Sequence, residues 1–371
     1  MGPHPAVAQV RLGVRRSLAG LVPGDLVLAA CSGGADSLAL AAALAFEGPR
    51  LGLRCGGVTV DHGLQAGSAD RAVAVTTALA GLGLAPVHSV AVSPSGPGGP
   101  ESAARAARYA ALDAVAADAG AAAILLGHTL DDQAETVLLG LARGSGSRSL
   151  AGMPARRGLY RRPLLAAGRA QTRAACAALR LQPWEDPHNA DPAYARARVR
   201  HQAMPALAAA LGPGIAEALA RSAAQLRADA DVLDSLAQAE LERIRDGGGA
   251  FEAAELAGLP AAIRTRVLRS AAIAAGCPAG SLTARHVAGL DALVTDWHGQ
   301  RWTDLPGGIR GRRRYGKLLF TAGPPARPGQ SARQRGAEPQ NGQAEPENGQ
   351  AAEQGNGQNA EGAGGRDGHG R

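Results

Sequence analysis

Residues 25–37 read DLVLAACSGGADS, and this stretch decides the fold. The apolar run at 25–30 predicts a short buried strand, and a helix is expected at 37–46, after the glycine pair. Paired glycines let the backbone approach a ligand closely, and the amide groups at a helix N-terminus attract anions. A phosphate-binding turn is therefore predicted at Ser32, Gly33, Gly34, Ala35, Asp36 and Ser37. The turn has neither the lysine of a Walker A motif nor the spacing of GxGxxG.

The alternation of strand and helix continues through the first half of the chain. Further strands are predicted at 57–60, 85–92 and 122–126, and helices at 68–82, 101–119 and 130–142. This alternation is typical of parallel βαβ units, so the expected fold class is α/β with a doubly wound parallel sheet. Ligands bind such sheets beyond the carboxyl ends of the strands. Polar residues follow the predicted strands there: the glycine turn, Asp61 with His62, and Gly127 with His128.

The composition divides the chain into three parts. Residues 1–205 carry the α/β pattern, and residues 206–320 are predicted to form a second, smaller and mostly helical domain. In the latter, helices are expected at 206–244, with a break at 212–214, and at 252–275, whereas 305–320 (LPGGIRGRRRYGKLLF) predicts a basic hairpin. Residues 321–371 are of low complexity and have little apolar surface to offset the entropy of ordering, so a disordered tail is expected.

Composition also excludes several classes of protein. Apolar runs fall far short of the roughly 20 residues that a membrane span needs, and the N-terminus lacks a secretory pattern. The four cysteines include no CxxC pair, which argues against a disulfide scaffold, a zinc ribbon and a cysteine-held iron–sulfur cluster. A cytoplasmic protein without a membrane partner is expected.

Basic charge is concentrated in two clusters. The formal net charge is +7, and residues 143–173 contain eight arginines and no acid. A second cluster at 301–317 surrounds Trp302 and Tyr315. Such clusters neutralise nucleic-acid phosphates, and aromatic rings among them can stack on bases. A solvated basic face is the alternative for each.

A series of motifs identifies a family. The glycine turn resembles the pyrophosphate loop (PP-loop) of the ATP pyrophosphatase superfamily, which binds the phosphates of ATP and releases AMP and pyrophosphate. The motifs that follow it resemble the tRNA(Ile)-lysidine synthase family and come in family order: VDHGL at 60–64, ESAARAARY at 101–109, LGHTLDDQAET at 126–136, RGSG at 143–146, AGM at 151–153, RPL at 162–164 and the segment from WEDP at 184–187 to RH at 200–201. The resemblance fades over 206–300 and partly returns at 308–320.

The resemblance implies a reaction and its participants. Members of this family activate the C2 carbonyl of the wobble cytidine by adenylation, in an isoleucine tRNA with a CAU anticodon, and the ε-amine of free L-lysine then displaces AMP to form lysidine. ATP is thus an expected substrate and Mg²⁺ an expected cofactor. Asp36 and Asp132 are the expected metal ligands and, with His128, the expected catalytic residues, whereas Asp131 is assigned to helix capping. Asp61 and His62 are expected beside the base and ribose of ATP.

Further residues are assigned to lysine and tRNA. Glu135 lies on the same helical face as Asp132 and is a predicted substrate-binding residue, with binding of the lysine ammonium group and orientation of a metal ligand both open. The other predicted substrate-binding residues are Glu101, Arg105, Arg108 and Arg196, although a surface ion pair between Glu101 and Arg105 is an alternative. The predicted tRNA-binding residues are Arg143, Arg148, Arg312, Arg313 and Arg314. Two positions depart from the family pattern: Ala197 stands where Asn is common, and Thr129 where His is frequent.

Three alternatives compete with this interpretation. A tRNA thiolation enzyme has a similar loop but generally relies on cysteine pairs or an iron–sulfur cluster. Amidating ligases such as GMP, NAD or asparagine synthetases share the loop but lack the arginine-rich stretch and the GHTLDDQAET helix. A non-enzymatic RNA-binding protein explains the basic clusters but not the polar residues at the strand ends. Both a monomer and a homodimer are compatible with the sequence.

Overall fold

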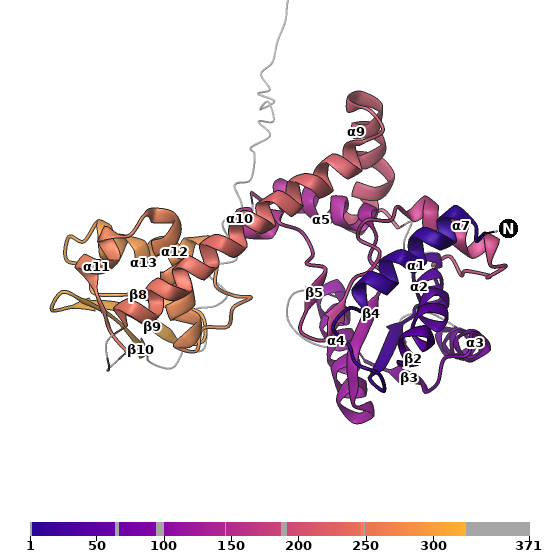
Figure 1. Cartoon of the computed structure of the whole chain (residues 1–371). Helices are drawn as coiled ribbons and strands as arrows, with labels where there is room; N and C mark the ends of the chain where they lie inside the picture. The colour runs from indigo at the N-terminus through magenta and orange to yellow at the C-terminus, as the bar shows by residue number, and fades with distance from the viewer. Residues whose placement is uncertain are drawn as a thin grey trace, which may run out of the picture.

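The molecule has two lobes joined by one long helix, α10 (Ile215–Ile244) (Figure 1). The computed structural model describes residues 2–63, 67–93, 100–144, 146–186, 191–245, 247 and 249–323, with the backbone alone at 100–102. The larger lobe contains the elements before α10, and the smaller lobe those after it (Figure 1).

A six-stranded sheet with the order β3-β2-β1-β4-β6-β5 forms the centre of the larger lobe. Its strands are β1 (Leu26–Ala30), β2 (Arg54–Asp61), β3 (Val87–Ala91), β4 (Ala121–Leu126), β5 (Arg156–Arg157) and β6 (Tyr160–Arg161). All neighbours pair in parallel except β5 with β6. The predicted α/β parallel sheet is therefore confirmed, and β1 and β4 are adjacent, which brings the glycine turn and Gly127 to one edge.

Helices cover both faces of this sheet. α1 (Pro5–Ser17), α2 (Ala35–Glu47), α3 (Ser68–Gly81) and α7 (Arg169–Ala178) pack on one face, where Val27 and Ala29 of β1 are buried. α4 (Pro100–Ala119) packs on the other face, against Leu26 and Leu28 of the same strand. Because β1 is apolar on both faces, burial on two sides follows from its sequence. α1 was not predicted.

Besides α7, four short or medium helices lie between β4 and α10 in the described chain. They are α5 (Leu130–Ala142), α6 (Ser147–Leu150), α8 (Ala195–Arg198) and α9 (Met204–Leu211), and the last two are separated by a π-helical turn at Val199–Ala203. The predicted boundary near residue 205 falls at the start of α9 and stays a prediction. In the described part of the chain no single helix is long and apolar enough to cross a membrane, although the bent pair Ala195–Leu211 and Ile215–Ile244 passes by length and composition together.

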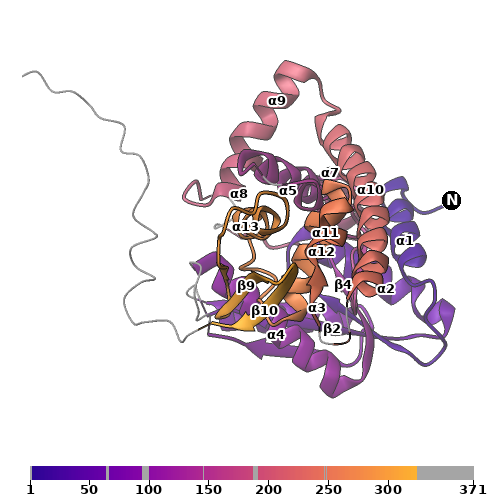
Figure 2. The same ribbon diagram turned by 90° about the vertical axis from the view of Figure 1, so that its left-hand side faces the viewer.

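The smaller lobe has its own core. α11 (Ala253–Gly258), α12 (Ala261–Ala274) and α13 (Ala284–Thr295) pack with the end of α10 around Leu256, Leu268, Leu290 and Leu318. A four-stranded antiparallel sheet, β7-β10-β9-β8, covers this core (Figure 2). Its strands are β7 (Phe251–Glu252), β8 (Thr303–Leu305), β9 (Ile309–Arg314) and β10 (Lys317–Ala322).

The smaller lobe corrects two predictions in detail. The basic hairpin is confirmed as β9 and β10, but β7, β8 and α13 were not predicted, so the helical lobe also carries a sheet. The tail was placed from residue 321, whereas Thr321 and Ala322 pair with Arg310 and Ile309 in β10. Residues 324–371 lie outside the described residues.

Candidate active site

The glycine turn joins β1 to α2 and aims the helix N-terminus at a cavity. Gly33 has a positive φ of 85°, and a Cβ there would lie 2.9 Å from Cγ2 of Val75, so glycine is required on both counts. The Ser37 hydroxyl donates to the carbonyl oxygen of Gly34 at 2.9 Å and accepts from the Ser32 amide at 3.2 Å. The first amide groups of a helix have no intrahelical partner, so this end of α2 can bind an anion.

Gly127 brings the end of β4 against the first turn of α2. A Cβ on Gly127 would lie 3.2 Å from the backbone of Asp36 and Ser37, closer than nine in ten real Cβ contacts. The close approach places His128 and the start of α5 beside the glycine turn. Asp36, His128 and Asp132 accordingly line one cavity of about 670 Å³.

A cluster of carboxylates and arginines forms one wall of this cavity. Arg169 lies between the two predicted metal ligands, since its Nη2 is 2.9 Å from Oδ1 of Asp132 and its Nε is 3.8 Å from Oδ2 of Asp36. Arg200 Nη2 is 3.3 Å from the same Asp132 oxygen. The Thr172 hydroxyl donates to Asp36. Burial raises the pKa of Asp36, whereas Arg169 and the hydrogen bonds from Thr129 outweigh burial and lower the pKa of Asp132.

Glu135 lies behind this cluster and is almost completely buried, with 2% of its side chain exposed. Its Oε1 accepts from Nε of Arg200 at 2.8 Å and from Nη2 of Arg169 at 3.3 Å. Its Oε2 accepts from Nη2 of Arg200 at 3.2 Å and lies 3.4 Å from Nε of Arg196. Both oxygens therefore contact guanidinium groups, and the ammonium group of a lysine could reach Glu135 only by displacing an arginine.

The capping of α5 differs from the prediction. Thr129 is the N-cap, and Asp132, not Asp131, completes the capping box, because Asp132 Oδ2 accepts from the Thr129 amide at 2.9 Å. Asp131 instead accepts from the amide of Arg169 at 2.6 Å, at the start of α7. Assigning the cap to Asp131 was wrong: the side chain three residues beyond the N-cap is the one that reaches back to it.

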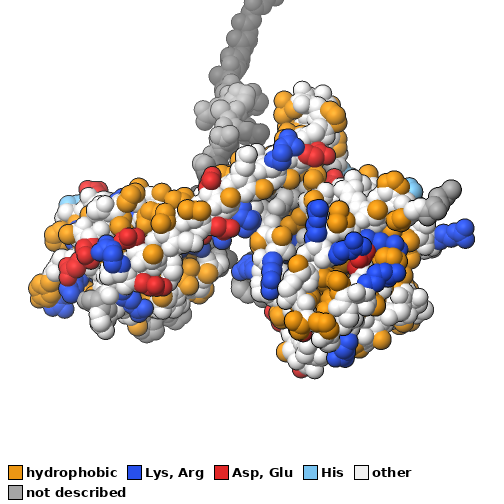
Figure 3. Space-filling model, in the orientation of Figure 1, with side chains coloured by type: hydrophobic (Ala, Val, Ile, Leu, Met, Phe, Trp, Pro, Cys, Tyr) orange, Lys and Arg blue, Asp and Glu red, His pale blue; other side chains and the backbone are white. Residues whose placement is uncertain are grey.

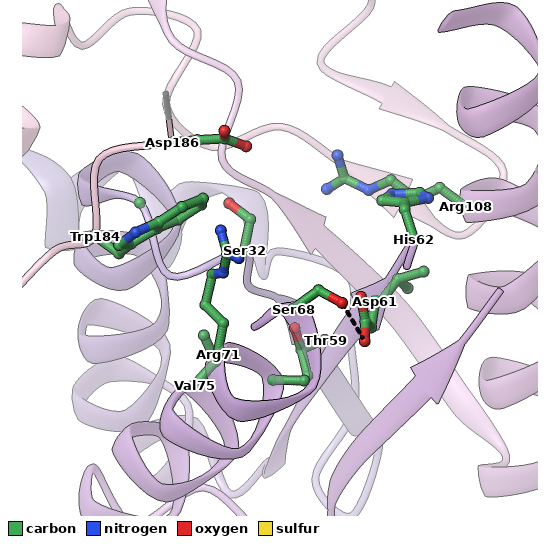
Figure 4. A pocket seen from close by; sticks show the side chains of 13 residues that line it. Ser32, Thr59, Asp61, His62, Ser68, Arg71, Val75, Arg108, Trp184 and Asp186 are labelled. Atoms are coloured by element: carbon green, nitrogen blue, oxygen red, sulfur yellow. Dashed lines mark hydrogen bonds between the residues drawn. The ribbon is translucent and has the colours of Figure 1, made fainter. Parts of the chain in front are cut away.

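Asp61 and His62 lie in a neighbouring cavity of about 340 Å³ (Figure 4). Asp61 accepts from the Gly63 amide at 2.9 Å and from the Ser68 hydroxyl at 3.2 Å, which fixes its carboxylate at the end of β2. The guanidinium of Arg71 stacks on the ring of Trp184, with 3.7 Å between its Cζ and the ring centroid. Figure 4 shows this stacked pair on the opposite side of the cavity from His62.

Arg108 contributes a positive charge to both cavities. Burial lowers the pKa of its guanidinium, and no carboxylate of the described residues lies within 4 Å of it. Arg105 is exposed, stacks on the Tyr109 ring and lines the larger cavity. The side chain of Glu101 lies outside the described residues, so its substrate-binding role stays a prediction and the alternative ion pair with Arg105 stays open. A half-buried cation beside a helix N-terminus, with no carboxylate partner among the described residues, attracts an anionic ligand.

Two family models match the chain over these elements. A model described as a PP-loop domain matches residues 14–207, and a model described as a TilS substrate binding domain matches residues 251–319. The tRNA(Ile)-lysidine synthase of Thermobifida fusca is 60% identical over 321 residues, which cover 86% of this chain and 99% of that protein. The chain belongs to the tRNA(Ile)-lysidine synthase family. The members named in these comparisons are ATP-dependent ligases of the PP-loop class.

Other comparisons agree with this assignment. The tRNA(Ile)-lysidine synthase of Streptomyces coelicolor is 55% identical over 352 residues, covering 87% of this chain and all of that protein. Among solved structures, a U34-tRNA thiolase from Methanococcus maripaludis with its [4Fe-4S] cluster aligns at 19% identity with a TM-score of 0.50, covering 60% of this chain and 78% of that chain. The likeness to the thiolase is one of fold alone. The four cysteines here are buried and free, and the described residues contain no group of three or more His, Cys, Asp or Glu that could hold a metal.

The arginines predicted to bind tRNA in this lysidine synthase family member differ in their surroundings. Arg143, Arg312 and Arg314 are exposed. Arg148 forms ion pairs with Asp231 and Asp234 of α10. Arg313 donates to the carbonyl oxygens of Leu293 and Val294 at 3.0 and 3.2 Å, at the end of α13. Arg313 therefore holds the hairpin on α13, a structural contact. Figure 3 shows acidic side chains among the basic ones on the smaller lobe.

Several residues of the site carry only a weak signal in the sequence. Arg169 is one of eight arginines in the basic cluster at 143–173, and Arg200 belongs to the RH motif at 200–201. The positions of Thr172 and Trp184 beside the glycine turn arise from long-range packing, for example the bond of 2.9 Å from the Trp184 amide to the Gly33 carbonyl oxygen. The available signal for Arg169 and Arg200 was the pair of acidic residues Asp132 and Glu135 on one face of α5, because two neighbouring carboxylates favour positively charged partners.

His128→Gln is expected to make the stability of the protein less sensitive to acid. Burial lowers the pKa of His128 to about 3, so below about pH 6.5 the unfolded chain binds a proton at this residue that the folded chain does not. This difference removes stability as the pH falls from about 6.5 towards 3. Melting temperatures between pH 7 and pH 4.5 should therefore fall less in the variant than in the wild type. His298→Gln, at a largely exposed histidine, should follow the wild-type profile; equal slopes for all three proteins would contradict the assignment.

Proposed function

We propose that the chain joins L-lysine to C2 of the wobble cytidine in an isoleucine tRNA with a CAU anticodon. The reaction would pass through an adenylated tRNA and release AMP and pyrophosphate. The observation that carries the proposal is the convergence of the α2 N-terminus, the Arg108 guanidinium and the carboxylates of Asp36 and Asp132 on two adjoining cavities. A tRNA substrate would also place the enzyme in the cytoplasm.

The two cavities suit the two ends of ATP. They share the lining residues Ser32, Gly34, Arg108, Trp184 and Asp186. A ligand bound across them would place its negative charge beside the helix N-terminus and the Arg108 guanidinium. The nucleoside would occupy the cavity lined by Asp61 and His62. The α-phosphate would then face the larger cavity, which leaves room there for the cytidine and the lysine.

The acidic residues fit a magnesium ion bound together with ATP. Mg²⁺ is usually held by one or two carboxylates and by substrate phosphates, so a site with only two protein carboxylates is sufficient. Asp36 and Asp132 would hold it, and Arg169 and Arg200, which both contact Oδ1 of Asp132, would have to move away from the carboxylates or turn towards the phosphates. When bound, the ion would offset the charge that develops on the phosphates as the bond between α and β breaks.

The remaining residues would orient the reactants. The C2 carbonyl oxygen of cytidine attacks the α-phosphorus, the bond to the bridging oxygen breaks, and pyrophosphate leaves. The lysine ε-amine, after loss of a proton, then attacks C2, and AMP leaves with the former carbonyl oxygen. The low pKa of His128 leaves its imidazole neutral at pH 7, so it would act as a hydrogen-bond donor to a phosphate oxygen. Arg105 and Arg108 would neutralise the phosphates.

The test is mass spectrometry of tRNA nucleosides after incubation with ATP and lysine. A CAU-anticodon isoleucine tRNA transcript should gain lysidine, and omission of ATP or lysine should abolish the product. A methionine tRNA transcript with the same anticodon serves as the specificity control. Failure to form lysidine from any isoleucine tRNA transcript, with a folded protein and intact ATP binding, would refute the proposed reaction.

Replacing Arg312 and Arg314 together by Gln is expected to weaken tRNA binding. Each exposed arginine that neutralises a phosphate releases counterions, so the slope of log affinity against log salt should flatten by up to about two units. ATP affinity should be unchanged, because these residues belong to the smaller lobe. Filter-binding titrations at several salt concentrations measure both quantities.

Arg313→Gln serves as the contrast within the same strand. Loss of its bonds to α13 should lower the melting temperature, which the double variant should largely preserve. An unchanged salt slope in a folded double variant would assign this cluster to a solvated face.

A further inference from the structure

Side chains of α10 form hydrogen bonds and ion pairs with a short segment of the larger lobe, residues 147–153. Nη2 of Arg227 donates to the carbonyl oxygens of Ala151 and Gly152, at 2.6 Å each. One turn further along α10, Asp231 accepts from Arg148 of the same segment, and Asp234 lies 3.4 Å from the Arg148 Nε. The segment is thus held from α10 at both of its ends.

The same segment is fixed to α5 by a second set of bonds. Nε2 of Gln133 donates to the Met153 carbonyl oxygen at 3.0 Å, and Oε1 of Gln133 accepts from the Met153 amide at 2.7 Å. Gln133 is buried, and a Cβ on Gly152 would lie 2.6 Å from its Oε1. Gly152 also has a positive φ of 64°. The oxygen and the nitrogen of the Gln133 side-chain amide therefore both bond α5 to the segment. The close approach of Gln133 leaves no space for a residue larger than glycine at position 152.

Gln133 follows Asp132 directly on α5, but it points in another direction. Residues are about 100° apart around a helix, so Asp132 and Glu135 face the arginine cluster while Gln133 faces the 147–153 segment. A rotation of α5 about its axis would have to break the Gln133 bonds before it displaced Asp132. Both views of the fold place α5 against α10 (Figures 1 and 2).

The guanidinium group of Arg227 donates its hydrogen bonds to the carbonyl oxygens of Ala151 and Gly152. Burial lowers the pKa of its guanidinium, and no carboxylate of the described chain lies within 4 Å of it. Two carbonyl oxygens on one nitrogen are an arrangement for holding a backbone in place. Arg221, six residues earlier on α10, is exposed and offers a matched comparison.

We infer that Arg227 is a positioning residue: through the 147–153 segment and Gln133 it fixes the orientation of α5, and so of Asp132, relative to α10. α10 is also the helix that leads into the smaller lobe. The contact between Arg227 and the 147–153 segment therefore affects both the placement of the two lobes and the geometry of the active site. The inference rests on the proposed function for its activity readout only.

The experiment compares Arg227→Ala, Arg227→Lys, Gln133→Leu and the control Arg221→Ala in the full chain. Arg227→Ala is expected to lower kcat for lysidine formation about tenfold, because small misplacements of reacting groups are costly, with KM for ATP and for tRNA within about twofold of wild type. Arg227→Lys, which can still donate to a carbonyl oxygen, should recover part of the loss. Amide hydrogen exchange over 130–153 should be faster in Arg227→Ala and Gln133→Leu but not in Arg221→Ala.

The outcomes separate positioning from other roles. In the double variant of Arg227→Ala with Gln133→Leu, the loss in kcat should not exceed that of the more impaired single variant, because both act through one segment. Multiplied losses, unchanged exchange over 130–153, or a raised KM for tRNA with kcat intact would each overturn the inference. If the wild type forms no lysidine, the proposed function fails, and the exchange measurement, which needs no turnover, still decides the inference.

Discussion

Asp132→Asn is expected to lower lysidine formation by about a hundredfold or more while the chain stays folded. The carbonyl oxygen of an asparagine can still accept the two bonds of 2.9 Å from the amide and hydroxyl of Thr129, so the cap of α5 survives. The other side-chain atom would become an NH₂ group facing Arg169 and Arg200. The site then loses the negative charge that we assign to the magnesium ion, which costs transition-state stabilisation. Lysidine yield by mass spectrometry and the melting temperature are the two measurements.

Asp131→Asn is the matched control for this variant. It removes one negative charge from the same helical turn but keeps an oxygen that can accept from the amide of Arg169. It should retain most of the activity. Activity near wild type in a folded Asp132→Asn protein would remove Asp132 from the catalytic machinery, and an equal loss in both variants would show that only the total charge of the turn matters.

The sheet and its ligand-binding edge could be predicted because their signals are local. The run at β1, the glycine turn and the capped start of α5 each act within a few residues, and the predicted helix at 130–142 has the bounds of α5. α1 was missed because its apolar side, Val7, Val10 and Val14, becomes meaningful only against α2 and α7. The strands at 156–157 and 160–161 are two residues each, too short for any periodic pattern.

The sequence predicted the positions of the acidic residues of the candidate site better than those of the arginines. Asp36 and Asp132 follow strands that are adjacent in the sheet, so strand order was enough to bring them together. The bonds from Arg169 to Asp132 and from Arg200 to Glu135 span 37 and 65 residues, and one arginine among many gives no local sign of such a partner. The sequence likewise shows no sign that Glu135 has arginine partners. Glu135 was assigned to binding the lysine substrate or orienting a metal ligand, whereas the structure places it among guanidinium groups.

Glu135→Gln tests what that position does. Its carboxylate is buried and opposes three arginines, so the neutral amide would leave positive charge uncompensated and would direct an NH₂ group at a guanidinium. The arginines are each a fifth to a third exposed, which lessens the penalty, and we expect the free energy of unfolding to fall by about 2–3 kcal/mol. The displaced Arg169 and Arg200 would also misplace Asp132, so kcat should fall with little change in KM for lysine. Urea denaturation and steady-state kinetics measure the two effects.

The comparison that decides the role of Glu135 is with Glu217→Gln. Glu217 is an exposed glutamate on α10, and its replacement should change neither the free energy of unfolding nor the kinetics. If Glu135 instead receives the ammonium group of lysine, Glu135→Gln would raise KM for lysine several-fold and leave the free energy of unfolding at the value of the control. A carboxylate that holds three guanidinium groups and one that binds a transient substrate thus differ in the first quantity measured, before any tRNA is added.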